Sequence, residues 1–198
     1  MSLQDFLQED RCDLNGLSAW LDQLPPQSRI DAAVSINAKM QQQLWEAAAD
    51  APRLSLTDFV PDGVPPLTEV IHWGRNSLPL FSRFQKRFCR AQPEVADNLL
   101  WGYNEQKLRV LTGPGYFVAR ETTAEELDDA GVVIDYTLEP EGKVPEWPRY
   151  IPNNRRLSRW IYNGTRDYMR RVSTHVTIGR ASRAGEWLPN WFVLCRAE

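Results

Sequence analysis

The spacing of apolar positions along the chain changes once, at a proline-rich stretch. Up to residue 60 the apolar residues recur at helical intervals, as on one buried face of a helix. From residue 67 onward they alternate with polar residues, as in half-buried strands. The segment 61–66, Pro-Asp-Gly-Val-Pro-Pro, separates the two patterns. We therefore expect a helical arm over residues 1–60 that packs on the body, and an antiparallel β domain over residues 61–198.

Two helices are predicted in the arm. A short one covers residues 17–24, because four apolar side chains there have helical spacing and two prolines follow. A longer one is predicted from an N-cap at Ser28 to about residue 50, with polar Asn37 and Gln41 interrupting its apolar face. One further turn, capped within 55–58, is expected before the proline-rich stretch.

The body is predicted to hold six to eight short strands. The expected strands lie within residues 67–73, 81–90, 99–120 as a hairpin, 132–138, 157–162, 175–181 and 187–196. The segment 81–90 also fits a helix, but its phenylalanines and its β-rich surroundings favour a strand. One brief helix is expected from Thr165, in which Tyr168, Met169 and Val172 share a face. The fold class is therefore mainly β with a helical arm (α+β), and the strands form a barrel or a sandwich.

Composition places the chain among ordinary globular proteins. No apolar run approaches the roughly 18 to 20 residues that a membrane span requires. The first ten residues are acidic and lack the basic start and apolar core of a secretion signal. Cys12, Cys89 and Cys195 have no CxxC spacing, which favours reduced thiols over a disulfide framework. We therefore expect a cytoplasmic protein with no membrane span.

The net charge of −3 is unevenly distributed. Residues 1–70 contain 4 Lys and Arg against 11 Asp and Glu, whereas residues 71–198 contain 19 against 15. This asymmetry predicts that the arm packs on the body with favourable electrostatics. Nine arginines and a single acid, Asp167, lie within 149–183. Arginines interleaved with aromatic residues could bind nucleic acid, but an isoelectric point of about 5.5 argues against it, and no nucleic-acid partner is expected.

Signatures of the common catalytic and cofactor sites are missing from the sequence. The chain has no GxGxxG, P-loop, GxSxG, HExxH or CxxC motif. No metal site is predicted, and the sequence names no cofactor, so any cofactor is unknown at this stage.

Aromatic and arginine side chains on the predicted strands are the candidate ligand-binding residues. Rings bury the apolar part of a small molecule, and arginine pairs with a carboxylate or phosphate. The candidates are Trp73, Trp101, Tyr103, Arg109, Tyr116, Arg120, Tyr136, Arg159, Trp160 and Tyr162.

Acid–base chemistry has few candidates, because the chain contains two histidines. His72, His175 and Asp135 each lie within a predicted strand, where they could meet at a barrel mouth. The alternative is structural: hydrogen-bonded histidines, and an ion pair of Asp135 with one of the nearby arginines. Both interpretations stay open here.

One stretch of the chain resembles a known family. Asp167-Tyr-Met-Arg-Arg-Val-Ser-Thr-His-Val-Thr-Ile-Gly-Arg180, followed by Asn190-Trp-Phe-Val-Leu194 and Arg196, is similar to the end of bacterial lipocalin-like domains of the GXWXG type. Met169 stands where those domains have an aromatic residue, and His72-Trp-Gly-Arg75 is similar to their opening segment. The chain also resembles an uncharacterised bacterial family, which implies no activity. The lipocalin-like resemblance implies an antiparallel calycin-like β-barrel that encloses a small apolar or amphipathic ligand.

Three functional hypotheses follow. The leading one is a small-molecule-binding protein that holds an apolar or amphipathic anionic ligand, such as a lipid-like molecule, in its barrel. The second is an enzyme, an isomerase or hydrolase, that uses His72 or His175 with Asp135. The third is a structural or interaction protein that forms a homodimer through the helical arm.

Overall fold

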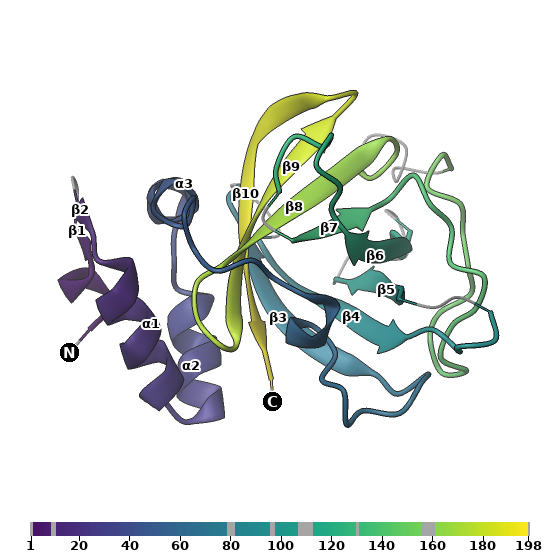
Figure 1. Cartoon of the computed structure of the whole chain (residues 1–198), viewed down its shortest axis with the longest axis horizontal. Coiled ribbons are helices and arrows are strands. Elements are labelled where there is room, and N and C mark those ends of the chain that lie inside the picture. Colours follow the sequence, from purple (N-terminus) through teal and green to yellow (C-terminus); the bar gives the residue numbers. More distant parts are fainter. Residues whose placement is uncertain are drawn as a thin grey trace.

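The body of the protein is a closed antiparallel β-barrel (Figure 1). The computed structural model describes residues 2–8, 11–78, 82–95, 98–106, 113–129, 131–155 and 161–197. Within these residues eight strands form the barrel, in the order β10-β3-β4-β5-β6-β7-β8-β9. The strands are β3 (Val70–Asn76), β4 (Arg83–Arg90), β5 (Leu100–Glu105), β6 (Phe117–Glu121), β7 (Val132–Asp135), β8 (Thr165–Arg171), β9 (Val176–Arg183) and β10 (Glu186–Arg196).

Each barrel strand pairs with its neighbour in the sequence, and β10 closes the ring on β3. In this closing pair Phe192 lies opposite Asn76, and Arg196 lies opposite His72. An up-and-down closure of this kind leaves no unpaired sheet edge. The predicted antiparallel barrel is therefore confirmed, and the sandwich alternative is wrong.

Alternation along the strands divides the barrel side chains into a lumen set and an outer set. Lys86 and Phe88 on β4 face the lumen, whereas Arg87 between them faces outward and pairs with Glu69. The apolar part of the lumen is built from Phe88, Leu100, Phe117, Ala119, Ile134, Met169, Phe192 and Leu194. The strand prediction for residues 81–90 is thus confirmed, with the phenylalanines and the lysine on one side.

Two glycines make room for rings inside the barrel. A Cβ atom on Gly102 would lie 2.3 Å from the Phe117 ring, and one on Gly179 would lie 2.3 Å from the Phe192 ring. Both contacts are far shorter than van der Waals distance, so each ring occupies the space that a side chain on the paired strand would need.

The helical arm covers the outer face of β8, β9 and β10. It consists of η1 (Leu3–Asp5), β1 (Leu7–Gln8), β2 (Arg11–Cys12), α1 (Leu14–Gln23), α2 (Pro26–Ala33), α3 (Ala38–Ala47) and η2 (Leu56–Asp58). Apolar side chains of the helices, such as Leu17, Leu21 and Leu44, pack with Ile178 and Val193 from the outer wall in one buried cluster. Figure 1 shows the helices together on one side of the barrel, next to β10. None of the helices in the described residues has the length and apolarity needed to cross a membrane.

The predicted single helix from Ser28 to residue 50 is wrong. The chain forms two helices there, with α2 starting at Pro26 and α3 capped by Asn37, whose side chain accepts a hydrogen bond from the Met40 N–H at 3.1 Å. Asn37 thus begins a helix instead of interrupting one, because its short side chain satisfies the free N–H groups of the first turn. Gln41, fully buried, donates to the carbonyls of Ile36 and Arg75 and so ties α3 to the barrel.

The predicted brief helix after Thr165 is also wrong. Residues Thr165–Arg171 form strand β8, in which Met169 faces the lumen and Tyr168 packs against the arm. The spacing of apolar residues around Tyr168 and Met169 fits a helix as well as a strand. The segment is a strand because it pairs with β7 on one side and β9 on the other. The predicted strand at 157–162 lies mostly outside the described residues.

An arm–body ion pair connects the acidic first third of the chain to the basic remainder. Arg171 on β8 holds Asp58 with two hydrogen bonds of 2.7 Å each. Burial opposes ionisation of Asp58, but the hydrogen bonds from Arg171 and Ser55 lower its pKa below the ordinary value. The division of the chain at residue 61 into two domains stays a prediction, since arm and barrel wall share one apolar cluster.

Candidate functional site

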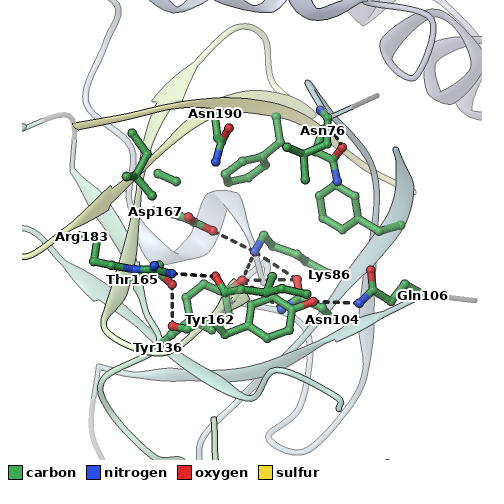
Figure 2. Close-up of a pocket in the computed structure, with 16 residues that line it drawn as sticks. Asn76, Lys86, Asn104, Gln106, Tyr136, Tyr162, Thr165, Asp167, Arg183 and Asn190 are labelled. Atoms are coloured by element: carbon green, nitrogen blue, oxygen red, sulfur yellow. Dashed lines mark hydrogen bonds and ion pairs between the residues drawn. The ribbon is translucent and has the colours of Figure 1, made fainter. Parts of the chain in front are cut away.

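One end of the barrel is plugged and the other is hollow. At the plugged end Phe59, from the segment after η2, is fully buried against His72 and Phe88. At the opposite end the lumen opens into a pocket of about 490 Å³, a volume typical of small-molecule sites. We take this hollow, the lumen pocket, as the candidate functional site (Figure 2).

A buried ion pair lies at the floor of the lumen pocket. Lys86 on β4 and Asp167 on β8 are 2% and 7% exposed, and their Nζ and Oδ2 atoms are 3.0 Å apart. Figure 2 shows the two side chains pointing toward each other from opposite walls. Burying both charges is costly, so a pair at this position requires close geometry and further hydrogen bonds.

Those further hydrogen bonds come from Asn104 and Tyr136. Lys86 Nζ donates to Asn104 Oδ1 at 3.2 Å and also contacts the Tyr136 hydroxyl. The Asn104 amide group donates in turn to the Tyr136 hydroxyl at 2.9 Å and to the Gly115 carbonyl at 3.0 Å. The ammonium group is therefore held by three partners, and its orientation is fixed by β5 and by the residue that follows β7.

A second tyrosine extends this polar network along the wall. The Tyr162 ring stacks on the Tyr136 ring with centroids 5.2 Å apart, and its hydroxyl accepts a hydrogen bond from Gln106 at 3.0 Å. Thr165, the first residue of β8, donates to the Tyr162 carbonyl at 2.6 Å. These bonds fix the ring of Tyr162 beside the floor of the pocket.

The remaining walls of the lumen pocket are largely apolar. Phe84 and Phe192 flank Lys86, with ring centroids 5.8 Å and 4.9 Å from its Nζ atom. Nearer the opening, Leu78 and Ile161 are each 44% exposed. A register shift in β10 between Trp187 and Trp191 coincides with the segment that adds Leu188 and Asn190 to the lining. The pocket thus combines a polar floor with apolar sides, as expected for an amphipathic ligand.

Burial shifts the pKa values of the side chains at the floor of the pocket. It lowers the pKa of the Lys86 ammonium, and the nearby Asp167 carboxylate partly offsets that effect. Burial together with Asp167 raises the pKa of Tyr136 well above its ordinary value, so this hydroxyl keeps its proton. Burial also raises the pKa of Tyr162. The charged side chains among the described lining residues are Lys86, Arg183 and Asp167, so the lining carries a formal charge of about +1 when all three are ionised.

Of the ten ligand-binding candidates from the sequence, the structure brings Tyr136 and Tyr162 to the lumen pocket. Arg109, Arg159 and Trp160 lie outside the described residues. The other five lie on the outer side of the barrel wall.

Three of those outer candidates, Trp101, Tyr103 and Tyr116, are buried under the long connection after β7. Trp147 from this connection packs edge-on against Tyr103 with centroids 5.1 Å apart, and the Tyr116 hydroxyl donates to the Pro148 carbonyl at 2.6 Å. Figure 1 shows the connection on the side of the barrel away from the helices. These rings fasten a surface segment to the barrel.

The last two outer candidates have different surroundings. Trp73 on β3 is 40% exposed and lines a second hollow, of about 730 Å³, between the barrel wall and α2. Arg120 on β6 binds Glu126 with two hydrogen bonds of 2.8 Å and reaches Asp135 at 3.3 Å. A binding role for these five residues would have to be exercised outside the lumen.

No hydrogen bond joins the catalytic candidates to one another among the described residues, although Arg196 lies opposite His72 and contacts His175. His72 lies inside the plugged end, where its Nε2 atom is 2.9 Å from the Phe59 carbonyl oxygen. His175 lies just before β9, with its Nδ1 atom 3.3 Å from Arg196. Asp135 faces outward from β7 and accepts hydrogen bonds from Arg166 and Thr137. Burial lowers the pKa of His72 to about 3, so the ring is neutral near pH 7.

The residues at the pocket floor escaped the sequence-based choice of candidates. Lys86 alternates with Phe84 and Phe88, and a lysine flanked by phenylalanines on one strand face is the signal that could have identified it. Asp167 was noticed as the one acid among nine arginines, which marks it as a residue in need of a partner. Asn104 carries no such signal, because amides are common on strand surfaces and in turns.

No group of three or more His, Cys, Asp and Glu side chains within the described residues is arranged to hold a metal ion. Comparison of the chain with protein-family models, curated proteins and solved structures gives no match.

Proposed function

We propose that the protein binds a small amphipathic molecule in the lumen pocket, with the polar end at the floor and the apolar part along the walls. The polar end meets Lys86, Tyr136 and Asn104, and the chain of the ligand contacts Phe84 and Phe192. The net positive lining favours an anionic polar end, such as a carboxylate.

One observation carries this proposal: a hydrogen-bonded ion pair lies at the bottom of an open hollow. A β-barrel of this size can fill its interior with side chains, and the plugged end does so with Phe59 and Phe88. At the other end the described residues leave about 490 Å³ unfilled above buried polar groups. These buried polar groups have partners within the barrel, and the hollow leaves them positioned to meet the polar end of a ligand.

The closed eight-strand antiparallel architecture is compatible with the lipocalin-like resemblance noted in the sequence. Up-and-down barrels of eight strands are wide enough to hold one small ligand. Membership in the lipocalin-like group is part of the proposal and depends on the same test of ligand binding.

Titration of isotope-labelled protein with octanoate, followed by amide and methyl NMR, tests the proposal directly. We expect shifts concentrated at residues around the pocket, including Ala181 and Thr165, with Leu17 and Leu21 in the arm unaffected. Replacing Ala181, which lines the pocket, by tryptophan should abolish binding by occupying the hollow. Ala124→Trp, at an exposed loop position, is the matched control and should bind like the wild type.

A second pair of variants measures how much the floor of the pocket, as distinct from its walls, contributes to binding. Lys86→Met should weaken octanoate binding at least about tenfold, since a charge-assisted hydrogen bond is worth roughly 1.5–3 kcal/mol. Lys39→Met removes a lysine from the exposed surface of α3 and should leave binding unchanged. Circular dichroism checks that each variant is folded. If panels of fatty acids, alcohols and aromatic acids all failed to shift pocket resonances, the proposed function would be rejected.

The other two hypotheses remain predictions. For the enzyme hypothesis, His72 and Asp135 would need to act separately, since they face opposite sides of the barrel wall. For the dimer hypothesis, the arm would have to pair through its outer surface, because its apolar face packs on the barrel.

A further inference from the structure

Lys86 differs from the other lysines that the structure describes. The chain has four, of which Lys39, Lys86 and Lys143 are in the described part. Lys39 is exposed on α3, and Lys143 donates to backbone carbonyls of the outer connection. Lys86 alone among these three places its amine at the floor of a pocket.

Burial favours the uncharged form of the Lys86 amine, whereas the ring faces around the nitrogen and the Asp167 carboxylate favour the ammonium form. Four rings enclose the nitrogen, with centroids 4.9 Å (Tyr136 and Phe192), 5.2 Å (Phe117) and 5.8 Å (Phe84) from Nζ. Desolvation lowers the pKa of this amine, which raises the fraction that carries a free electron pair. Lysines with a lowered pKa in such surroundings are nucleophiles toward carbonyl groups.

Groups that can move protons lie around the same nitrogen. Asp167 at 3.0 Å can accept a proton from the ammonium group, and the Tyr136 hydroxyl, which keeps its proton, lies in direct contact. The Asn104 side chain supplies both an acceptor for the amine and donors to its neighbours. An amine, a proton acceptor and a hydroxyl donor around one pocket floor are the groups that imine formation requires.

We propose that Lys86 forms a covalent, reversible imine with an aliphatic aldehyde bound in the lumen pocket. This inference rests on the proposed function, because the pocket must first admit the molecule. The apolar walls select an aldehyde with a hydrocarbon chain, whose carbonyl end reaches the polar floor.

The reaction balances without any further reactant. Asp167 takes one proton from the Lys86 ammonium, the nitrogen electron pair attacks the carbonyl carbon, and the oxygen takes a proton back, which gives a carbinolamine. A second proton passes from nitrogen to that oxygen, the C–O bond breaks, and water leaves as the C=N bond forms. The product is a protonated imine paired with the Asp167 carboxylate, so the charge at the floor is the same before and after.

Reductive trapping on the full chain tests this inference. The protein is incubated with octanal and sodium cyanoborohydride, which converts an imine to a stable octyl amine, and the modified residue is located by peptide mass spectrometry. Lys86 should be alkylated several-fold faster than any other lysine, because a lowered pKa leaves more of the amine uncharged and the pocket holds the aldehyde beside it. Excess 1-octanol, which has the same chain length but forms no imine, should slow the labelling of Lys86 alone.

The outcomes separate this inference from the proposed function. Labelling at Lys86 that octanol suppresses supports both. If NMR shows octanol or octanoate in the pocket but octanal labels only exposed amines, the imine is rejected and ligand binding stands. If neither octanol nor octanoate binds and Lys86 is not labelled, both are rejected.

Two variants test which lysine is labelled, whatever the overall rate of labelling. Lys86→Arg keeps a positive charge beside Asp167 but cannot form the imine, so selective labelling at this position should disappear. In the Lys39→Met variant, Lys86 should be labelled as it is in the wild type. Selective labelling of Lys86 in the wild type is decisive even if Lys86→Arg folds poorly.

Discussion

Phe59 stacks on His72 inside the plugged end of the barrel, with ring centroids 5.5 Å apart and planes 21° from parallel. The same residue accepts a hydrogen bond on its carbonyl oxygen from His72 Nε2 at 2.9 Å. A segment of the arm thus seals the end of the lumen that lies away from the pocket.

Removing the seal should cost stability without harming the pocket. Phe59 is fully buried, so Phe59→Ala should lower the free energy of unfolding by about 3–5 kcal/mol through lost burial and a residual cavity. Urea denaturation measures this change. Leu127→Ala, at a position 41% exposed, is the control and should change stability by less than about 0.5 kcal/mol. A cost below about 1 kcal/mol for Phe59→Ala would contradict the packed seal.

Buried His72 should make stability depend on pH in the mildly acidic range. The folded ring has a pKa of about 3, against 6.5 ordinarily, so between these values the unfolded chain binds the proton and the folded chain does not. Stability is then complete above about pH 6.5 and falls as the pH drops, by about 2 kcal/mol between pH 7 and pH 5. Denaturant titrations at several pH values test the slope.

The two histidines can be separated by substitution. Burial also lowers the pKa of His175, helped by Arg29 and Arg196, so it contributes in the same direction. His72→Gln should remove most of the slope between pH 7 and pH 5, and the double change His72→Gln with His175→Gln should remove the histidine part entirely. A His72→Gln variant with the wild-type slope would show that the ring is not buried in its neutral form.

Replacing one residue of the Lys86–Asp167 pair should destabilise the fold more than replacing both residues with apolar ones. Lys86→Met leaves the Asp167 carboxylate buried without its cation and should destabilise the fold by about 3–5 kcal/mol. The double variant Lys86→Met with Asp167→Leu should recover at least about 2 kcal/mol of that loss. A double-mutant cycle by chemical denaturation gives the coupling, and strictly additive losses would argue against a direct interaction.

Two glycines provide a matched test of lumen packing. A Cβ atom at Gly102 would lie 2.3 Å from the Phe117 ring and 2.6 Å from the Arg87 carbonyl oxygen, whereas nothing lies within 4 Å of one at Gly63. Gly102→Ala should therefore cost about 1–3 kcal/mol, and Gly63→Ala should stay within about 0.5 kcal/mol of the wild type. Thermal unfolding of both proteins suffices, and equal melting temperatures would show that the barrel interior is looser than described.

The sequence predicted the barrel because strand alternation is a local property. Lumen residues such as Phe84, Lys86 and Phe88 are two apart, and their order alone assigns them to one face. The errors at Asn37 and Thr165 have a different origin. An asparagine such as Asn37 can either cap a new helix or interrupt the apolar face of a longer one, and the sequence does not distinguish the two. After Thr165 the apolar residues have helical spacing, but pairing with β7 and β9 makes the segment a strand.

The candidate site was harder to predict, because it depends on which face of each strand is inward. Trp101 and Tyr103 are as aromatic as Tyr136 and Tyr162, but they lie on the outer face, and the connection that buries them follows only after β7. Rings alone do not distinguish a ligand wall from a covered outer surface. Lys86 and Asp167 come from strands that are far apart in the sequence, so no local pattern joins them.

The closure of β10 on β3 has a consequence for synthesis on the ribosome. Arg196 and His72, which pair in the closed barrel, are separated by more than half of the chain. The barrel therefore cannot close until residues near 196 have left the exit tunnel. Until then the nascent protein exposes the edges of β3 and β9, two rows of unpaired backbone groups that other chains could join. A holding chaperone that covers these edges during translation would therefore protect the newborn chain from aggregation.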